Sequence, residues 1–481
     1  MGKASPSQSN AALGALTSSL GSSVMLKKED RYAASMDNLR LSVMPDAVVR
    51  PADEVELKEM LRLANKYGVP VTTRGGGSAA TGATTPLHGG WVLDLSHWQS
   101  IDIDTTLGLA KVHPGVRTAA LQRAAEAEGL FYPPDPSSAE FCTIGGNIAT
   151  NAGGLRAAKY GTTRDYVVAL RGFLPTGEPV RWGAPLKKCA TGFNLRDLWI
   201  GSEGMLGIIT EATLKLIPKP KARYTFLVAF KDEIAALSAI RRLMESRLLP
   251  AALEFMDRQT VACAERYSKE EAFPSLPGQA LVLIELDGHP SAIDDERKQL
   301  SAWAKSEAIA FEEADAGGAE RLWRIRRICS QAMFELGDAK LNEDIVIPPQ
   351  SYEALLIFTQ ELGASFNLPT PTFGHAADGN FHVHIMYHRS NEDACKRAEE
   401  ALQVLMEKVI ALGGVISGEH GIGLAKSSFF TLQHSTAEIE AMQSIKRALD
   451  PKNILNPGKM FTPTRVWDYR AESFRLPWDH A

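Results

Sequence analysis

The stretch Thr143-Ile-Gly-Gly-Asn-Ile-Ala-Thr-Asn-Ala-Gly-Gly154 decides the fold. It holds four glycines within ten residues, with threonine and asparagine between them. Because glycine carries no Cβ atom, the backbone at these positions can approach a bound molecule closely. The composition therefore indicates backbone wrapped around a flat or phosphorylated ligand.

Two further glycine clusters lie on either side of this stretch. The first, residues 74–82 (RGGGSAATG), follows an expected strand, and its backbone N–H groups suit a pyrophosphate, with Ser78 and Thr81 as extra donors. Taken alone it fits a plain turn equally well. It lacks the spacing of a Rossmann fingerprint or a P-loop, so neither NAD nor ATP is favoured. The third cluster, residues 201–209 (GSEGMLGII), adds another close approach.

Two histidine-containing segments, residues 374–384 (GHAADGNFHVH) and 417–423 (SGEHGIG), carry the candidate chemistry. Imidazole and carboxylate groups hold zinc, iron or manganese while leaving positions open for a substrate. A neighbouring histidine can act as a base near neutral pH. A lone histidine is more often structural, but the joint pattern favours a metal site. His382 and His384 are expected to share one face of a strand.

Patterns of apolar residues divide the chain. Residues 43–220 open with a strand, a helix over 53–67 and a second strand that runs into the first glycine cluster, which indicates an α/β unit. Residues 221–415 are typical of an α+β domain whose sheet is covered mainly on one face. Residues 1–42 are expected to be an N-terminal extension. Residues 462–481 form a tail whose aromatic side chains are expected to pack against the body: Trp467, Tyr469, Phe474 and Trp478.

Composition narrows the class of protein. The net charge is −5 and the apolar content is 44%, which are the values of a globular protein without a nucleic-acid partner. The five cysteines are scattered, which argues against an iron–sulfur cluster and favours a reducing compartment. The chain shows no signal peptide and no apolar run of about 18 residues, the length a membrane span needs. We therefore expect a cytoplasmic protein without a transmembrane segment, peripheral to a membrane only through a partner.

The three glycine clusters, in this order, resemble the FAD-binding domain of the vanillyl-alcohol-oxidase/p-cresol-methylhydroxylase superfamily. The two histidine segments resemble its D-2-hydroxyacid dehydrogenase branch, which includes the glycolate oxidase flavin subunit and D-lactate dehydrogenases. The likeness runs from about residue 43 to residue 461. It implies an α+β fold with a two-subdomain FAD-binding domain over 43–220, an α+β cap domain over 221–415 and a C-terminal segment over 416–461 that returns to the flavin.

The resemblance also implies a set of site residues. One divalent metal ion (zinc, iron or manganese) is held by His375, His382 and Glu419, with His384 as a fourth ligand or a supporting neighbour. His420 removes the substrate proton, and Arg326 binds the substrate carboxylate. Arg324 and Arg327 fit a solvated helix face. The residues implied for FAD are Arg74, Gly75, Gly76, Gly77, Ser78, Thr81, Gly82, Pro134, Asp135, Thr143, Gly145, Gly146, Asn147, Ala152, Gly153, Gly154, Tyr160, Gly161, Glu203, Gly204, Gly207, Ile208, Ile209 and Asn456.

The reaction that the resemblance implies is metal-assisted hydride transfer from a small D-2-hydroxy acid to flavin N5. Where hydroxyglutarate enzymes carry a lysine for the distal carboxylate, this chain has Asn342, with Lys340 two residues earlier. This difference favours D-lactate or glycolate over D-2-hydroxyglutarate. Electrons are expected to pass to a separate redox protein or a quinone, and direct reaction with oxygen stays open.

Two other interpretations remain at this point. A metal hydrolase without flavin would use the same histidine and glutamate ligands, but it leaves three glycine clusters without a role. A catalytically silent flavin subunit of an electron-transfer assembly would explain the glycine clusters, and the intact His420 and metal ligands count against it.

Overall fold

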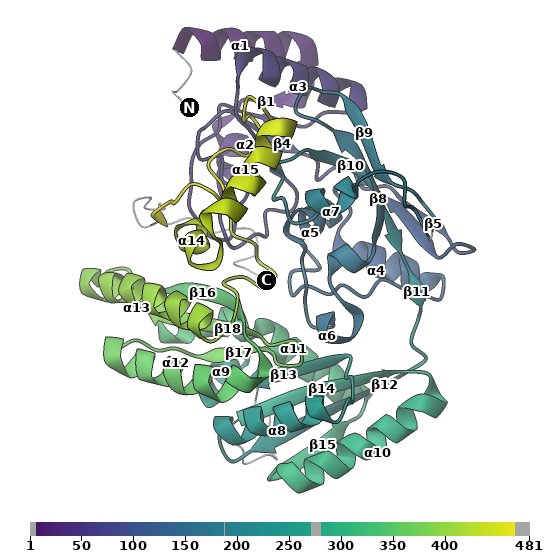
Figure 1. Cartoon of the computed structure of the whole chain (residues 1–481), viewed down its shortest axis with the longest axis vertical. Coiled ribbons are helices and arrows are strands. Elements are labelled where there is room, and N and C mark those ends of the chain that lie inside the picture. The colour runs from purple at the N-terminus through teal and green to yellow at the C-terminus, as the bar shows by residue number, and fades with distance from the viewer. Residues whose placement is uncertain (1–5, 187, 271–279, 467–481) are drawn as a thin grey trace.

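The computed structural model describes residues 6–186, 188–270 and 280–466. The aromatic part of the expected tail, from Trp467 onward, lies outside the described residues. The chain forms two bodies, an upper one that carries α1 and α15 and a lower one built on one large sheet (Figure 1). Within the described ranges, no helix combines the length and the apolar character that crossing a bilayer requires.

The upper body begins with a four-stranded sheet in the order β1-β2-β4-β3, in which β2, β4 and β3 run parallel. Helix α1 packs on α3, and Ala12, Leu16 and Leu20 are buried in the core of this sheet because they recur at a spacing of four. The first globular unit therefore starts before residue 42, whereas the sequence predicted an extension there. The elements are α1 (Pro6–Leu20), β1 (Val24–Met25), α2 (Lys28–Ala33), β2 (Ala47–Val49), α3 (Glu54–Tyr67), β3 (Val71–Arg74) and β4 (Trp91–Asp94).

The second part of the upper body is a five-stranded antiparallel sheet in the order β5-β6-β10-β8-β9. Its core includes Ile144 and Ile148 of α5, so the short helix that follows Thr143 is fixed against the sheet. The elements are β5 (Ile101–Asp104), β6 (Leu109–Val112), α4 (Thr118–Ala127), β7 (Leu130–Phe131), α5 (Ile144–Thr150), α6 (Ala157–Tyr160), β8 (Val167–Phe173), β9 (Pro179–Gly183), α7 (Leu195–Trp199), β10 (Ile208–Lys215) and β11 (Ile217–Pro218).

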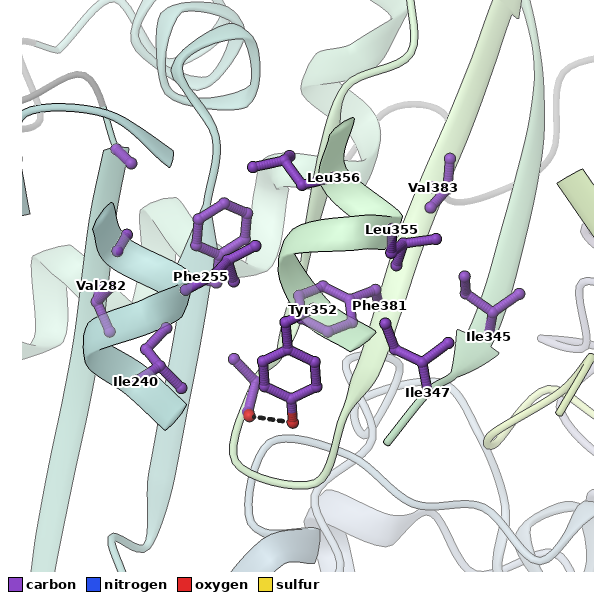
Figure 2. Close-up of a cluster of buried hydrophobic side chains, with 14 of the residues drawn as sticks. Ile240, Phe255, Val282, Ile345, Ile347, Tyr352, Leu355, Leu356, Phe381 and Val383 are labelled. Atoms are coloured by element: carbon purple, nitrogen blue, oxygen red, sulfur yellow. Dashed lines mark hydrogen bonds between the residues drawn. The ribbon is translucent and has the colours of Figure 1, made fainter. Parts of the chain in front are cut away.

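The lower body is a seven-stranded antiparallel sheet in the order β15-β12-β14-β13-β17-β18-β16. Helices α8, α10, α12 and α13 cover one face, where Phe255, Phe381 and Tyr352 pack together (Figure 2). The elements are β12 (Ala222–Phe230), α8 (Glu233–Glu245), β13 (Ala252–Met256), α9 (Arg258–Ser268), β14 (Ala280–Gly288), α10 (Pro290–Glu307), β15 (Ala310–Ala314), α11 (Ala316–Ala332), β16 (Ala339–Val346), α12 (Tyr352–Phe366), β17 (Thr372–His375), β18 (Asn380–Tyr387) and α13 (Glu392–Ala411).

The other face of this sheet is also covered, although the sequence predicted cover mainly on one face. Helices α9 and α11 pack there with Met256 and Met386, and Leu155 of the upper body joins the same cluster. The reason is that alternate residues along β13 are apolar on both faces: Phe255 points to one core and Met256 to the other. The second face is thus the one that meets the upper body.

After α13 the chain returns to the upper body through α14 (Phe430–Gln433) and α15 (Thr436–Leu449), drawn in yellow in Figure 1. Ile454 and Leu455 are fully buried in the core of the first sheet. The N–H of Val71 donates to the carbonyl of Ile454 at 2.7 Å, and the N–H of Asn456 donates to the carbonyl of Val71 at 2.7 Å. The returning segment therefore lies along β3, next to the first glycine cluster.

Candidate active site

Three potential metal ligands converge between the two bodies. His375 and His382 come from the antiparallel pair β17 and β18, and Glu419 comes from the loop between α13 and α14. Their donor atoms all lie within 4.8 Å of one another, and both imidazole Nε2 atoms are 3.7 Å from Glu419 Oε1. The buried Nε2 of His375 has no hydrogen-bond partner among the described residues. Two imidazoles and a carboxylate with an orphaned nitrogen fit a divalent ion.

A buried carboxylate orients the first of these histidines. Glu254 of β13 lies directly opposite His375 of β17 in the sheet register, and its Oε1 is 2.7 Å from His375 Nδ1. Its Oε2 accepts a hydrogen bond of 2.8 Å from Arg326 Nε. Burial raises the pKa of Glu254, but the charges of Arg326 and His375 outweigh it and the pKa is lowered overall. One carboxylate therefore fixes both a metal ligand and the candidate substrate arginine.

Arg326 is the buried member of the arginine run on α11. Only 3% of Arg326 is exposed, its guanidinium stacks over the Phe373 ring at 4.6 Å, and it lines the central cavity. Arg324 is exposed and pairs with Glu270, as expected for a solvated face. Arg327 is exposed as well but also lines the cavity, which the sequence did not indicate.

The loop that carries Glu419 and His420 is held by one carboxylate. Asp344 Oδ2 accepts hydrogen bonds from the Ser417 hydroxyl at 2.9 Å and from the N–H groups of Gly418 at 2.9 Å and of Glu419 and His420 at 3.0 Å. Asp344 is fully buried. Three successive N–H groups point at one oxygen, and these contacts hold the loop backbone in the conformation in which both Glu419 and His420 line the cavity.

The His420 ring lies parallel to His382, with ring centroids 5.6 Å apart and an interplanar angle of 22°. Its Nδ1 is 3.9 Å from Asp344 Oδ2. Burial raises the pKa of Asp344, but the charges of His420 and Lys426 outweigh it and keep the pKa well below its usual range. Asp344 is thus an anion that faces the imidazole and can stabilise its protonated form.

His384 lies outside the metal triad. It is fully buried and its ring stacks on Phe373 at 5.0 Å, and it is absent from the set of donors that converge on one point. The sequence left open whether it is a fourth ligand or a supporting neighbour, and the arrangement favours the second role.

A cavity of about 280 Å³ connects these side chains with the glycine clusters. A Cβ atom on Gly76 would lie 2.3 Å from the carbonyl oxygen of Phe141, and one on Gly145 would lie 2.7 Å from Pro114. These positions therefore have no room for a side chain, and the loops that line the cavity pack closely together through glycine. We call the glycine clusters that line the cavity the cradle. The implied cofactor residues that line the cavity are Arg74, Gly75, Gly76, Gly77, Ser78, Thr143, Gly145, Gly146, Asn147, Ala152, Glu203, Gly204, Gly207 and Ile209.

The remaining implied cofactor residues do not line this cavity. The Tyr160 hydroxyl donates to Asp287 of the lower body at 2.8 Å, so it joins the two bodies. Asn456 donates to the carbonyl oxygens of Ala83, which directly follows the first glycine cluster, and of Glu203 in the third cluster. It therefore links these two parts of the chain. The residues away from the cavity are Thr81, Gly82, Pro134, Asp135, Gly153, Gly154, Tyr160, Gly161, Ile208 and Asn456.

Two functional residues, Glu254 and Asp344, were not predicted from the sequence, although each stands in a recognisable sequence context. Glu254 is a lone carboxylate inside the apolar strand 252–256, and Asp344 precedes the apolar residues 345–347. Charged residues are almost never fully buried unless they are paired, so such positions indicate a partner. The stretch 340–344 forms most of β16, so its side chains alternate between the two faces of the sheet.

Comparison with known proteins agrees with this geometry. Residues 219–460 match the family of FAD linked oxidases, C-terminal domain, and residues 45–183 match an FAD binding domain. The chain belongs to the FAD-linked oxidase family and is an FAD-dependent oxidoreductase.

Among its relatives is the glycolate oxidase subunit GlcD of Bacillus subtilis, 39% identical over 87% of this chain and 89% of that protein. The D-lactate dehydrogenase of Anaerostipes hadrus is 35% identical over 86% of this chain and 89% of that protein. Among solved structures, p-cresol methylhydroxylase has a TM-score of 0.80 at 16% identity, covering 95% of this chain and 98% of that chain. The α+β fold of the vanillyl-alcohol-oxidase/p-cresol-methylhydroxylase type is confirmed.

Proposed function

We propose that this protein oxidises a small D-2-hydroxy acid, with D-lactate and glycolate favoured, to the 2-oxo acid and passes the electrons to a separate acceptor. The observation that carries the proposal is the convergence of His375, His382 and Glu419 within 4.8 Å beside His420, with Arg326 on the wall of the same cavity. The names of the relatives, glycolate oxidase subunit and D-lactate dehydrogenase, support the same substrate class.

Each side chain has a role in this proposal. His375, His382 and Glu419 would hold a divalent ion, which supplies polarisation of the substrate hydroxyl. Bound FAD supplies the hydride acceptor. Arg326 binds the substrate carboxylate, since its guanidinium lines the cavity while Glu254 fixes its orientation.

His420 accepts the hydroxyl proton on its imidazole. The positive charge that the ring gains then faces Asp344, whose Oδ2 is 3.9 Å from Nδ1. The stacked His382 ring on one side restricts rotation of the imidazole. The imidazole is therefore oriented before the substrate binds, and the carboxylate that stabilises its later positive charge is already in place.

We propose a redox protein or a quinone as the acceptor, because the sequence offers no nicotinamide fingerprint and no cluster cysteines. All five cysteines are unbridged in the structure, which supports a reducing compartment such as the cytoplasm.

The test is anaerobic reduction of the FAD in the purified holoprotein. D-lactate or glycolate should bleach the yellow flavin band, whereas L-lactate should not. Removal of metal by a chelator should stop the bleaching, and Zn²⁺ or Mn²⁺ should restore it. His420→Ala should slow reduction by roughly 10²–10⁴-fold, while His388→Ala, at a side chain that is 66% exposed, should not change it. Flavin that stays oxidised with every D-2-hydroxy acid would contradict the proposal.

A further inference from the structure

Part of the cavity wall is polar and has no role in the reaction described above. Ser330 of α11 and Asn342 of β16 both line the cavity that holds Arg326 and His420. The Oδ1 atom of Asn342 is shielded from solvent and lacks a hydrogen-bond partner among the described residues. We call Ser330 and Asn342 the polar wall.

A second orphaned polar group stands beside the polar wall. His384 is the direct cross-strand neighbour of Asn342, with β18 paired to β16. It is fully buried, and within the described ranges neither ring nitrogen has a hydrogen-bond partner. Buried polar atoms are normally satisfied by protein, water or ligand. Because Asn342 lines the cavity and His384 does not, it is the unsatisfied Asn342 oxygen that indicates binding of a polar group from outside the chain.

The hydrogen-bonding state of Ser330 follows from its neighbour. Lys340 Nζ donates to the Ser330 hydroxyl at 2.8 Å and also to the Ser330 carbonyl oxygen. An ammonium group has only donors, so the Ser330 oxygen accepts and its own hydrogen remains free. The polar wall thus offers N–H or O–H donors, from Ser330 and from the Asn342 amide nitrogen, and one shielded acceptor without a partner, Asn342 Oδ1.

The same neighbour argues against a second carboxylate on the substrate. Burial lowers the pKa of Lys340 to about 7, so the positive charge behind Ser330 is partial at neutral pH. A carboxylate can accept from Ser330 and from the Asn342 amide nitrogen, but it has no hydrogen to donate and leaves Asn342 Oδ1 unsatisfied. A hydroxyl group can donate to Asn342 and accept from Ser330 at once.

We infer that the polar wall selects a 2-hydroxy acid that carries a further hydroxyl group on C3, in preference to one that ends in an alkyl group or a second carboxylate. This inference rests on the proposed function and names its substrate class more closely. Leaving buried polar groups unpaired in a complex lowers kcat/KM, here by roughly 10- to 100-fold.

The test compares D-glycerate with D-2-hydroxybutyrate, which has the same number of heavy atoms and a methyl group in place of the hydroxyl. Rates of anaerobic flavin reduction as a function of concentration give kcat/KM without an external acceptor. D-glycerate should exceed D-2-hydroxybutyrate at least tenfold, and D-malate should be the poorest of the three.

Substitutions test whether the polar wall causes the preference for D-glycerate over D-2-hydroxybutyrate. Asn342→Leu should reduce the ratio between D-glycerate and D-2-hydroxybutyrate to near one or below it, and Ser330→Ala should reduce it partially. Ser306→Ala, on the exposed end of α10, is the matched control and should keep the wild-type ratio. FAD content and Tm of each variant verify folding, and the ratio of two substrates is insensitive to the fraction of active protein.

Each outcome decides between distinct conclusions. Reduction of the flavin by all three acids without preference for D-glycerate, or with D-malate as the best substrate, overturns the inference and leaves the proposed function intact. Reduction by none of these acids, nor by D-lactate or glycolate, overturns the proposed function and the inference with it. A wild-type preference that Asn342→Leu does not change also overturns the assignment to the polar wall.

Discussion

The two bodies build their shared cavity in opposite ways. On the upper side the wall is mainly backbone, and it depends on atoms that are missing at Gly76 and Gly145. On the lower side the wall is made of side chains, and it depends on the buried carboxylates of Glu254 and Asp344 that hold them. On the upper side, adding a Cβ atom to one glycine is enough to disturb the wall. On the lower side, a contact is lost when either of its two partners changes. We therefore expect substitutions on the two sides to affect different properties of the protein.

The largest expected effect follows from changing the carboxylate that holds the loop. Asp344→Asn removes a carboxylate whose Oδ2 accepts four hydrogen bonds and introduces N–H donors, so the loop with Glu419 and His420 loses its conformation. Flavin reduction by D-lactate should fall roughly 100-fold, and the unfolding free energy should drop by about 3 kcal/mol. Stopped-flow reduction and thermal unfolding measure the two effects.

The control for this change is Asp338→Asn, because the Asp338 side chain is 57% exposed. It should behave like the wild type in both measurements. Wild-type kinetics in Asp344→Asn would mean that the loop glycines and Lys426 are sufficient to hold the loop.

A second change on the same side, Glu254→Gln, is expected to act on the metal. Glutamine can no longer accept from both His375 and Arg326 as a carboxylate does, so metal affinity should fall roughly 10- to 100-fold. Metal content after dialysis against a chelator gives the result. Glu285→Gln is the matched control, since Glu285 is also buried in the same sheet but pairs with Arg223. Equal metal loss in both variants would contradict the role assigned to Glu254.

On the upper side, Gly76→Ala tests whether the cradle requires a residue without a Cβ atom. The new Cβ would lie 2.3 Å from the Phe141 carbonyl oxygen, so the cradle has to move. Overpacking of about 1–2 kcal/mol should weaken FAD retention roughly tenfold, while metal binding stays unchanged. Gly288→Ala, where nothing lies within 4 Å of the new atom, serves as the control. FAD content after gel filtration is the measurement, and full retention would show that the cradle adapts.

The smallest expected effect concerns Lys340, a partly buried ammonium that has no ion-pair partner among the described residues. Its pKa is about 7 in the folded protein against 10.5 in the unfolded chain, because burial disfavours the charge. Between these values the unfolded chain binds more protons, so this group makes stability rise with pH. Lys340→Met should therefore raise Tm by a few degrees at pH 6, with the gain shrinking toward pH 10. Lys305→Met, on an exposed part of α10, should show no such pH dependence.

The difference between the two sides also explains what the sequence could predict. The glycine clusters and the two histidine segments indicated the cofactor, the fold and the converging ligands, because each signal lies within a short stretch. Glu254 and His375 are 121 positions apart, and Asp344 and His420 are 76 apart, so their contacts depend on strand register and loop path. Helix α1 was missed because its three leucines stand among mostly small and polar residues, which leaves a weak apolar pattern.

The returning segment has a consequence for how the protein is made. The outer strand of the first sheet, β3, is sealed by residues that lie 384 positions later, since Val71 pairs with Leu455. The ribosome must therefore have produced the chain as far as Leu455 before this edge can close. Until then the nascent chain carries an open strand edge beside the first glycine cluster, and we expect FAD to bind only after that edge has closed.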